Sequence, residues 1–560
     1  MTAALTPWVD GLTFAQAFQR TAEKFGDHDA LVFPQLGYRL RYAEMLVEVQ
    51  ETARALVALG VGRGEHVGIW ATNWPQWVLV QFAAAQVGAV LVNINPAYRA
   101  HELEYVLKQA DITTLLLIDQ FKQSNFFDIL QTVCPELATA EPGALRAAAC
   151  PRLRWVVSIK SLKRAGMLTW EEFRQRAQSI SPAELSQRAQ ESSPTDVVNI
   201  QYTSGTTGFP KGAMLTHRNL LMNAWHVGQR LAFTDRDRLC LPVPFYHCFG
   251  CVMGTLMCPL YGAAVVVPAE SFDPLASLQA IAAERCTAAY GVPTMFIAEL
   301  NHPCFGEFDL SSLRTGIMAG SPCPIEVMRA VVEKMGARDI TIAYGLTEAS
   351  PVITQTETTD SVEHRVSTVG RALPGLEVRL VTPGTLDPSP AGVPGELLVR
   401  GHAVMKGYYN KPAETAAAIT PDGWLHTGDL AAQTADGYYR ITGRIKDLII
   451  RGGENVYPRE VEEFLHTHPA IADVQVVGLP DAKFVEEVSA WIRLKPGAQL
   501  SEEEVRVFCR GQIAHYKVPR YIVFVDEYPT TVTGKVQKFK LKEMGIARFG
   551  LQRAAAVETA

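Results

Sequence analysis

The chain has 560 residues, of which 48% are hydrophobic and 20% are charged. This composition is that of a globular protein with room for roughly three to four domain-sized units. The net charge of −6 disfavours nucleic acid or an anionic membrane as the main partner, and the ten scattered cysteines indicate a reducing compartment. Met1 to Phe14 lacks the pattern of a signal peptide, and polar residues interrupt the apolar stretch 77–94. We therefore expect no transmembrane segment and predict a cytoplasmic location.

The N-terminal part of the chain alternates between helical and strand patterns up to residue 120. Such alternation predicts βαβ units and mainly parallel sheets. A less regular stretch, 121–195, follows, and we interpret it as a surface excursion. The expected helices cover residues 14–25, 42–59 and 102–110, and the expected strands cover residues 67–70 and 89–94.

The stretch from Tyr202 to Gly212 reads YTSGTTGFPKG and is rich in glycine and hydroxyl side chains. It follows an apolar run that predicts a buried strand, and it precedes a helix for which Thr216 is the expected N-cap. Glycines allow close approach of the backbone to a ligand, hydroxyls donate to phosphate oxygens, and Lys211 supplies charge. The spacing differs from that of a Walker A loop. A plain glycine-rich turn is the simpler alternative.

The later part of the chain divides into an α/β region, a β-rich region and a C-terminal unit. Residues 239–370 again alternate between helix and strand patterns, whereas 370–400 contains short strands separated by Gly and Pro. A boundary near Gly443 leaves a segment long enough to fold alone. The expected elements of these regions are strands 263–267, 288–291, 377–381, 395–400, 471–477, 489–494 and 521–525, helix 275–285, a helix starting at Pro458, and a helix opened by the capping box Ser501-x-x-Glu504.

A Cys-x-x-Cys pair follows a histidine in the sequence His247-Cys-Phe-Gly-Cys251. A zinc site would need a second pair of ligands, and haem attachment would need the histidine after the second cysteine. Neither pattern is present, so we interpret these cysteines as packing residues along the wall of a pocket.

Three further motifs carry chemistry only in combination. Tyr344-Gly-Leu-Thr-Glu348 follows a strand, Gly423-Trp-Leu-His-Thr-Gly-Asp429 ends on a carboxylate, and Pro529-Thr-Thr-Val-Thr-Gly-Lys535 places a lysine beside a glycine. Alone, they would suggest a capped helix, an Asx turn and a solvated lysine. In this order after the 202–212 stretch, they resemble the signatures of the adenylate-forming superfamily, which includes acyl-CoA synthetases, firefly luciferase and nonribosomal-peptide adenylation domains.

The resemblance implies an α/β fold in two domains. It implies a large N-terminal domain of parallel-sheet subdomains with a β-rich subdomain (residues 1–445), a small mobile α+β lid domain (446–548) and a tail (549–560). It also implies ATP, Mg²⁺ and CoA as ligands, with a small carboxylic acid as substrate. The oligomeric state stays open, with a homodimer as one candidate.

The same resemblance assigns roles to individual residues. Tyr344 stacks on adenine, Asp429 and Arg444 bind the ribose, Lys446 is the hinge, and Glu348 holds Mg²⁺. The implied catalytic set consists of Lys535, Thr347, Glu348 and His247. The implied nucleotide-binding set consists of Thr203, Ser204, Gly205, Thr206, Thr207, Gly208, Lys211, Gly320, Ser321, Tyr344, Gly345, Asp429 and Arg444.

The nature of the acid and of the acceptor depends on a few positions. Gly452 and Gly453 resemble the turn that faces the CoA pantetheine. Gly345 stands where acetate-specific members carry tryptophan, so an open slot for a longer acid is expected. The predicted acyl pocket consists of Phe249, Val252, Met253, Met295 and Gly345, which are apolar or lack a side chain. Segments 284–296 and 450–459 look like those of medium-chain fatty acyl-CoA synthetases. Aryl-CoA ligases of the coumarate type and a non-catalytic nucleotide-binding relative are the alternatives.

Overall fold

The computed structural model describes residues 7–555 except 161, 204–209, 322, 324, 391, 453, 482, 531–535 and the side chain of Asn455. The chain forms two compact units. The first unit comprises Met1–Glu377 and Val399–Leu425, and the second comprises Val378–Leu398 and His426–Ala560. This division falls earlier in the chain than residue 445, and the two-domain boundary and the hinge at Lys446 stay predictions.

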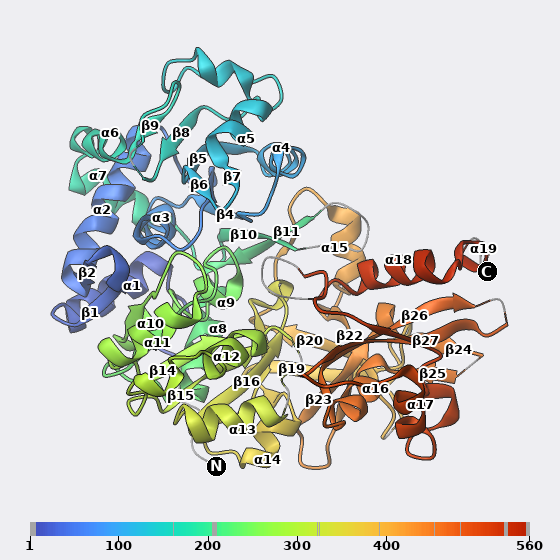
Figure 1. The fold of residues 1–560 in the computed structure, drawn as a ribbon. Coiled ribbons are helices and arrows are strands. Elements are labelled where there is room, and N and C mark those ends of the chain that lie inside the picture. Colours follow the sequence, from blue (N-terminus) through green and yellow to red (C-terminus); the bar gives the residue numbers. More distant parts are fainter. Residues whose placement is uncertain are drawn as a thin grey trace. The chain divides into compact units, whose positions relative to one another are not determined.

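A nine-stranded sheet forms one layer of the first unit (Figure 1). Its central strands are parallel, as the alternating sequence pattern predicts, and antiparallel strands close both edges. The strands, in spatial order, are β18 (Arg371–Ala372), β17 (Val352–Gln355), β16 (Asp339–Gly345), β15 (Thr315–Ala319), β14 (Ala288–Gly291), β12 (Arg238–Cys240), β13 (Ala264–Val266), β1 (Asp29–Phe33) and β2 (Tyr38–Arg41).

An eight-stranded sheet is the second layer of this unit. It is also parallel at its centre, and antiparallel pairing of β10 with β11 and of β11 with β21 forms one edge. The strands, in spatial order, are β21 (Gly407–Tyr408), β11 (Lys211–Thr216), β10 (Val197–Thr203), β4 (Val90–Ile94), β3 (His66–Trp70), β5 (Ile112–Leu117), β8 (Trp155–Ser158) and β9 (Leu168–Thr169). A separate pair is formed by β6 (Gln120–Phe121) and β7 (Ser124–Asn125).

Helices pack against these sheets (Figure 1). Their apolar faces are buried. Thr216 caps α8 as predicted, because its hydroxyl accepts a hydrogen bond from the Asn219 N–H at 3.1 Å. The helices of the first unit are α1 (Phe14–Phe25), α2 (Tyr42–Ala58), α3 (Pro75–Gln86), α4 (Ala100–Gln109), α5 (Phe126–Val133), α6 (Trp170–Gln175), α7 (Pro182–Gln190), α8 (His217–Arg230), α9 (Cys248–Cys251), α10 (Met257–Tyr261), α11 (Pro274–Ala283), α12 (Pro293–Leu300), α13 (Ile325–Lys334), α14 (Val362–Ser367) and α15 (Pro412–Ala418).

The interpretation of residues 121–195 as a surface excursion was wrong for its central part. Strand β8 (Trp155–Ser158) lies inside the eight-stranded sheet, parallel to β5, and three of its four residues are buried. Helix α5 also packs inward, since the Phe126 ring stacks on Trp70 with centroids 4.1 Å apart. Both elements are short, so their apolar runs are too brief for a periodic pattern to stand out.

The second unit has an α+β core. A long hairpin of β26 and β27 forms its centre, and β28 adds to β27 in parallel. Pro458 opens α16 and the Ser501–Glu504 capping box opens α17, both as predicted. Its elements are β19 (Leu376–Val381), β20 (Gly395–Gly401), β22 (Leu425–Gln433) and β23 (Tyr439–Arg444) in one sheet, β25 (Glu454–Val456), β24 (Ile449–Arg451), β27 (Val485–Leu494), β26 (Ile471–Asp481) and β28 (Tyr521–Phe524) in another, and helices α16 (Pro458–His466), α17 (Glu502–Cys509), α18 (Lys538–Phe549) and α19 (Gln552–Ala555). Strands β19, β20 and β22 each cross a boundary between the units, so that one end of each strand is assigned to the first unit.

None of the helices within the described ranges is long and apolar enough to cross a membrane.

Candidate functional site

The hairpin of β10 and β11 brings the two ends of the glycine-rich stretch together. Thr203 ends β10 and Lys211 begins β11, and the two residues pair directly across the antiparallel ladder. Ser204, Gly205, Thr206, Thr207 and Gly208, which lie between them, are outside the described residues. The structure therefore defines the base of the predicted phosphate loop. There, the strand register pairs the hydroxyl-bearing Thr203 with the ammonium-bearing Lys211.

The Glu348 carboxylate lies beside this hairpin. It belongs to a short 3₁₀ turn, Thr347–Ala349, which follows β16, and the residue is only 8% exposed. Its Oε1 atom accepts hydrogen bonds from Thr203 Oγ1 at 3.0 Å and from the Tyr408 hydroxyl at 2.9 Å. Within the described ranges, Oε2 accepts no hydrogen bond. A buried carboxylate held by neutral donors on one oxygen can offer the other to a cation.

Tyr408 is a member of this site that the sequence analysis missed. It lies on β21, which pairs with β11 through Ala213 and Met214. The Lys211 ammonium lies 5.2 Å from the centroid of the Tyr408 ring, within the range of a cation–π interaction. Burial, and then the nearby charge of Glu348, raise the pKa of the Tyr408 phenol, so it remains a hydrogen-bond donor.

Cys248 lies close to both Thr347 and His247. Thr347 Oγ1 lies 3.7 Å from Cys248 Sγ, and His247 caps α9 by accepting a hydrogen bond from the Phe249 N–H at 3.2 Å. Burial raises the pKa of the Cys248 thiol to about 12, so this thiol is neutral at physiological pH. All ten cysteines are free, and Cys248 and Cys251 are buried, which agrees with a packing role.

Two neighbouring parallel strands end at the predicted adenine site. Ala319 of β15 pairs with Ala343 of β16, so Gly320 and Ser321 leave the same sheet edge as Tyr344. The carboxyl ends of parallel strands are where such sheets bind ligands. The structure thus brings these three predicted nucleotide-binding residues together, and their contacts with adenine stay a prediction.

Gly345 is required locally for a reason that the sequence did not indicate. It is exposed, yet a Cβ atom at this position would lie 1.8 Å from the Pro351 carbonyl oxygen. That oxygen also accepts a hydrogen bond from the Leu346 N–H at 2.9 Å. Its φ angle is outside the left-handed region, so close approach of the backbone, and not φ, demands glycine here. A role of Gly345 in the acyl pocket stays a prediction.

The other predicted pocket residues are buried apolar side chains of the first unit. Phe249, Val252 and Met253 lie on or directly after α9, and Met295 lies on α12. The Phe249 ring stacks on Tyr290 with centroids 5.4 Å apart. These side chains could line an apolar chain, and no titratable group is among them.

The second unit carries the remaining predicted residues. Asp429 and Arg444 are directly opposite each other on β22 and β23, with Oδ1 and Nε 3.1 Å apart. Lys446 is exposed in the 3₁₀ turn Ile445–Asp447, and Gly452 is in a turn with a φ of +59°. Gly453 and Lys535 lie outside the described residues.

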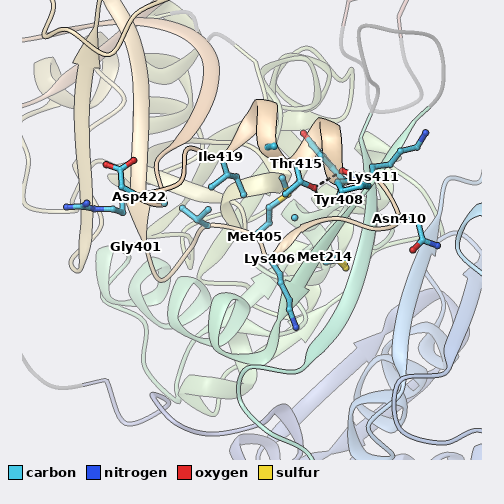
Figure 2. Close-up of a pocket in the computed structure, with 16 residues that line it drawn as sticks. Met214, Gly401, Met405, Lys406, Tyr408, Asn410, Lys411, Thr415, Ile419 and Asp422 are labelled. Atoms are coloured by element: carbon cyan, nitrogen blue, oxygen red, sulfur yellow. Dashed lines mark hydrogen bonds between the residues drawn. The ribbon is translucent and has the colours of Figure 1, made fainter.

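A cavity of about 840 Å³ lies beside Tyr408 within the first unit (Figure 2). Its wall includes Met214 of β11 and residues 404–408, together with α15. In Figure 2, Met405 and Ile419 face its interior, whereas the Lys411 ammonium extends away from it. No motif in the sequence predicted it, because its walls come from segments about 200 residues apart.

The described side chains hold no group of three His, Cys, Asp or Glu residues that could bind a metal by themselves. A magnesium site does not need such a group, because Mg²⁺ usually takes one or two carboxylates and completes its shell with water and substrate phosphates. Glu348 fits that requirement, since its Oε2 atom has no donor among the described residues.

Two family models match the chain. The model of the AMP-binding enzymes matches residues 18–409, and the model of the AMP-binding enzyme C-terminal domain matches residues 460–535. The chain is 52% identical over 539 residues to the protein named "Putative acyl-CoA synthetase YngI" of Bacillus subtilis, covering 96% of this chain and 98% of that one. It is 43% identical over 537 residues to the human mitochondrial medium-chain acyl-CoA ligase ACSF2, covering 95% of this chain and 87% of that one.

Solved structures give the same picture. The anthranilate CoA ligase AuaEII in complex with anthranoyl-AMP superposes with a TM-score of 0.84 at 28% identity, over 97% of this chain and 98% of that one. ATP-bound MatB from Rhodopseudomonas palustris superposes with a TM-score of 0.79 at 29% identity, over 95% and 99%. The chain belongs to the AMP-binding enzymes, the adenylate-forming superfamily, among their acyl-CoA synthetases.

Proposed function

We propose that the protein is an AMP-forming fatty acid–CoA ligase that acts on medium-chain acids. It converts the acid and ATP into acyl-AMP and pyrophosphate, and then transfers the acyl group to the thiol of CoA with release of AMP. The observation that carries the proposal is the buried Glu348 carboxylate held by Thr203 and Tyr408 beside Lys211. This arrangement suits a nucleotide triphosphate with a bound cation.

The first half-reaction has to bring two anions together, the carboxylate of the acid and the α-phosphate of ATP. Lys211 and the hydroxyl side chains of the phosphate loop would hold the triphosphate, and Thr347 would contact the α-phosphate. Glu348 would hold Mg²⁺, which offsets the charge of the phosphates when bound. Lys535 would contact both reacting groups and stabilise the charge that develops between them.

Several of the predicted side chains would hold the nucleoside. Tyr344 would stack on adenine beside Gly320 and Ser321, and Asp429 with Arg444 would bind the ribose hydroxyls. The pairing of Asp429 with Arg444 at 3.1 Å supports this assignment, because the guanidinium orients the carboxylate, whose oxygens accept hydrogen bonds.

The second half-reaction would use a different position of the lid domain. The exposed Lys446 would be the hinge, and the turn at Gly452 and Gly453 would then face the pantetheine of CoA. Proline at position 446 should still permit acyl-AMP formation but slow the transfer to CoA by roughly a hundredfold, because reacting groups would be misplaced. Acyl-AMP and acyl-CoA measured separately in single turnovers test this, and wild-type transfer would place the hinge elsewhere.

The names of the relatives support a medium-chain fatty acid as the substrate class. Phe249, Val252, Met253 and Met295 are apolar and buried, as a pocket for an alkyl chain requires. Each buried methylene contributes about 0.8 kcal/mol, so a pocket of medium length favours such acids over acetate. A panel of C2 to C18 and aryl acids with ATP and CoA, with AMP release as the readout, tests the proposal.

An aryl-CoA ligase of the coumarate type is the second candidate. It is favoured by the superposition on an anthranilate CoA ligase and by the stacked rings of Phe249 and Tyr290. Aryl acids that outperform octanoate in the same panel would decide for it. Absence of ATP–pyrophosphate exchange with every acid would instead indicate a non-catalytic nucleotide-binding relative.

A cytoplasmic location also remains our prediction, which fractionation of cells would test.

A further inference from the structure

We propose that Tyr408 is a positioning residue for the nucleotide and its metal. Its hydroxyl fixes the Glu348 carboxylate so that Oε2 faces the cation, and its ring holds the Lys211 ammonium. This inference rests on the proposed function and adds to it a residue from a part of the chain that the active-site motifs do not include.

The geometry joins two charged groups of opposite sign through one side chain. The Tyr408 hydroxyl donates to Glu348 Oε1 at 2.9 Å, and the centroid of the same ring lies 5.2 Å from Lys211 Nζ. Thr203 donates to the same Oε1 atom at 3.0 Å. Because both donors act on one oxygen, the carboxylate is held in a single orientation with Oε2 on the opposite side.

The backbone around Tyr408 is fixed to the same turn. The Met405 N–H donates to the Glu348 carbonyl oxygen at 2.9 Å, and Ser350 Oγ donates to the Ala403 carbonyl oxygen at 2.6 Å. On α8, the Asn219 side chain donates to the carbonyl oxygens of His402 and Val404. The segment 402–408 is therefore attached both to the Glu348 turn and to α8, and the tyrosine has little freedom to move away.

Two substitutions separate the hydroxyl from the ring. Tyr408→Phe removes the hydrogen bond to Glu348 and keeps the aromatic face for Lys211. Tyr408→Leu removes both contacts. The matched control is Tyr409→Phe, since the adjacent hydroxyl donates to Asp111 Oδ2 at 3.0 Å and has no contact with Glu348.

The test measures ATP binding to the full-length protein by calorimetry, once with excess Mg²⁺ and once in EDTA. We expect Tyr408→Phe to weaken binding about tenfold with Mg²⁺, as loss of a charge-assisted hydrogen bond would, and about twofold or less in EDTA. Tyr408→Leu should in addition weaken binding in EDTA by about threefold, because the cation–π contact is lost. Tyr409→Phe should match the wild type under both conditions.

A second measurement asks whether the hydroxyl acts through Glu348. In a Glu348→Gln background, where the cation ligand is already lost, Tyr408→Phe should have no further effect on the Mg²⁺ dependence. Electron paramagnetic resonance of Mn²⁺ with ATP gives the same comparison without any turnover. Melting temperatures of all variants check that each one is folded.

Each result has a distinct meaning. Tyr408→Phe with wild-type affinity for ATP in Mg²⁺ would overturn the inference, as would an equal loss with and without the metal, which would indicate a general structural role. If the wild-type protein itself fails to bind ATP with Mg²⁺, the proposed function is wrong and the inference goes with it.

Discussion

Two buried carboxylates, one in each unit, have almost the same exposure but different partners. Glu348 is 8% exposed and accepts hydrogen bonds from two neutral hydroxyl groups, whereas Asp429 is 6% exposed and lies 3.1 Å from the Arg444 guanidinium. The first has no cationic partner among the described residues, and it can offer its Oε2 atom to an incoming cation. The second is paired with a guanidinium, and its oxygens suit the hydroxyls of a sugar. Burial alone thus says little about the role of a carboxylate, and the partner decides it.

The same contrast extends to the cations of the two units. Lys211 of the first unit lies against the Tyr408 ring, while Lys446 of the second unit is exposed. A lysine held by an aromatic face is positioned before the substrate arrives. We expect the second unit to supply its catalytic charge from Lys535.

Lys535→Ala should have the largest effect. Formation of acyl-AMP should fall roughly a thousandfold, because removal of one preorganised charge at a site where two anions meet costs that much. Acyl transfer from supplied acyl-AMP to CoA should be nearly unchanged, since it joins no second anion to the phosphate. Quantification of the two half-reactions in single turnovers checks this, and an equal loss in both would contradict the assigned role. Acetylation of this lysine should act like the substitution, because it also removes the charge.

Glu348→Gln and Asp429→Asn test the comparison directly. The amide of Glu348→Gln can still accept the two hydroxyl hydrogen bonds but offers no charge, so adenylation should fall roughly a hundredfold. Asp429→Asn should cost about tenfold, mainly through KM for ATP, since a charged acceptor is replaced by a neutral one. Excess Mg²⁺ should partly rescue the first variant and have no effect on the second. The reverse pattern would exchange the two roles.

The motifs predicted part of this site and missed the rest for physical reasons. Thr203, Lys211 and Glu348 belong to short strings whose chemistry is visible in the sequence, and the structure brings them together. Tyr408 has no such string, and it reaches the site only because β21 pairs with β11, from which it is separated by about 190 residues. Pairing over that separation depends on the whole fold and leaves no local pattern.

The fold was predicted best in the regions where helix and strand patterns alternate regularly. Helix α1 and strand β14 have the expected bounds, Phe14–Phe25 and Ala288–Gly291. The short strand β8 was missed in a region without clear periodicity. The sequence also could not predict what a side chain at position 345 would contact. The clash at Gly345 arises where the register between β16 and β17 shifts, and this shift depends on the pairing of the two strands.

Gly345→Ala should therefore lower activity on all acids alike. The added methyl group would meet the Pro351 carbonyl oxygen and displace the backbone next to Tyr344, and overpacking of this kind typically costs about 1–3 kcal/mol of stability. We expect kcat/KM to fall about tenfold for both octanoate and propionate, with a lower melting temperature. A loss confined to long acids would instead support an open acyl slot at this position. Met295→Ala is the matched control, because Met295 is a buried apolar residue of the predicted pocket. The activity that this variant loses should depend on the chain length of the acid.

The smallest effect is expected from the caps of two helices, one in each unit. Thr216 and Ser501 form the same capping box, with Asn219 and Glu504 as the respective partners. Loss of either hydroxyl through Thr216→Ala or Ser501→Ala should cost about 1 kcal/mol of stability. Only the first should also lower the affinity for ATP, because Asn219 donates to the carbonyl oxygens of His402 and Val404 in the segment that carries Tyr408. Calorimetric unfolding and ATP binding, measured on both variants, would show equal destabilisation with unequal binding. Equal binding losses would mean that a small change in the stability of either unit is enough to disturb the site, and that the cap of α8 has no particular connection to Glu348.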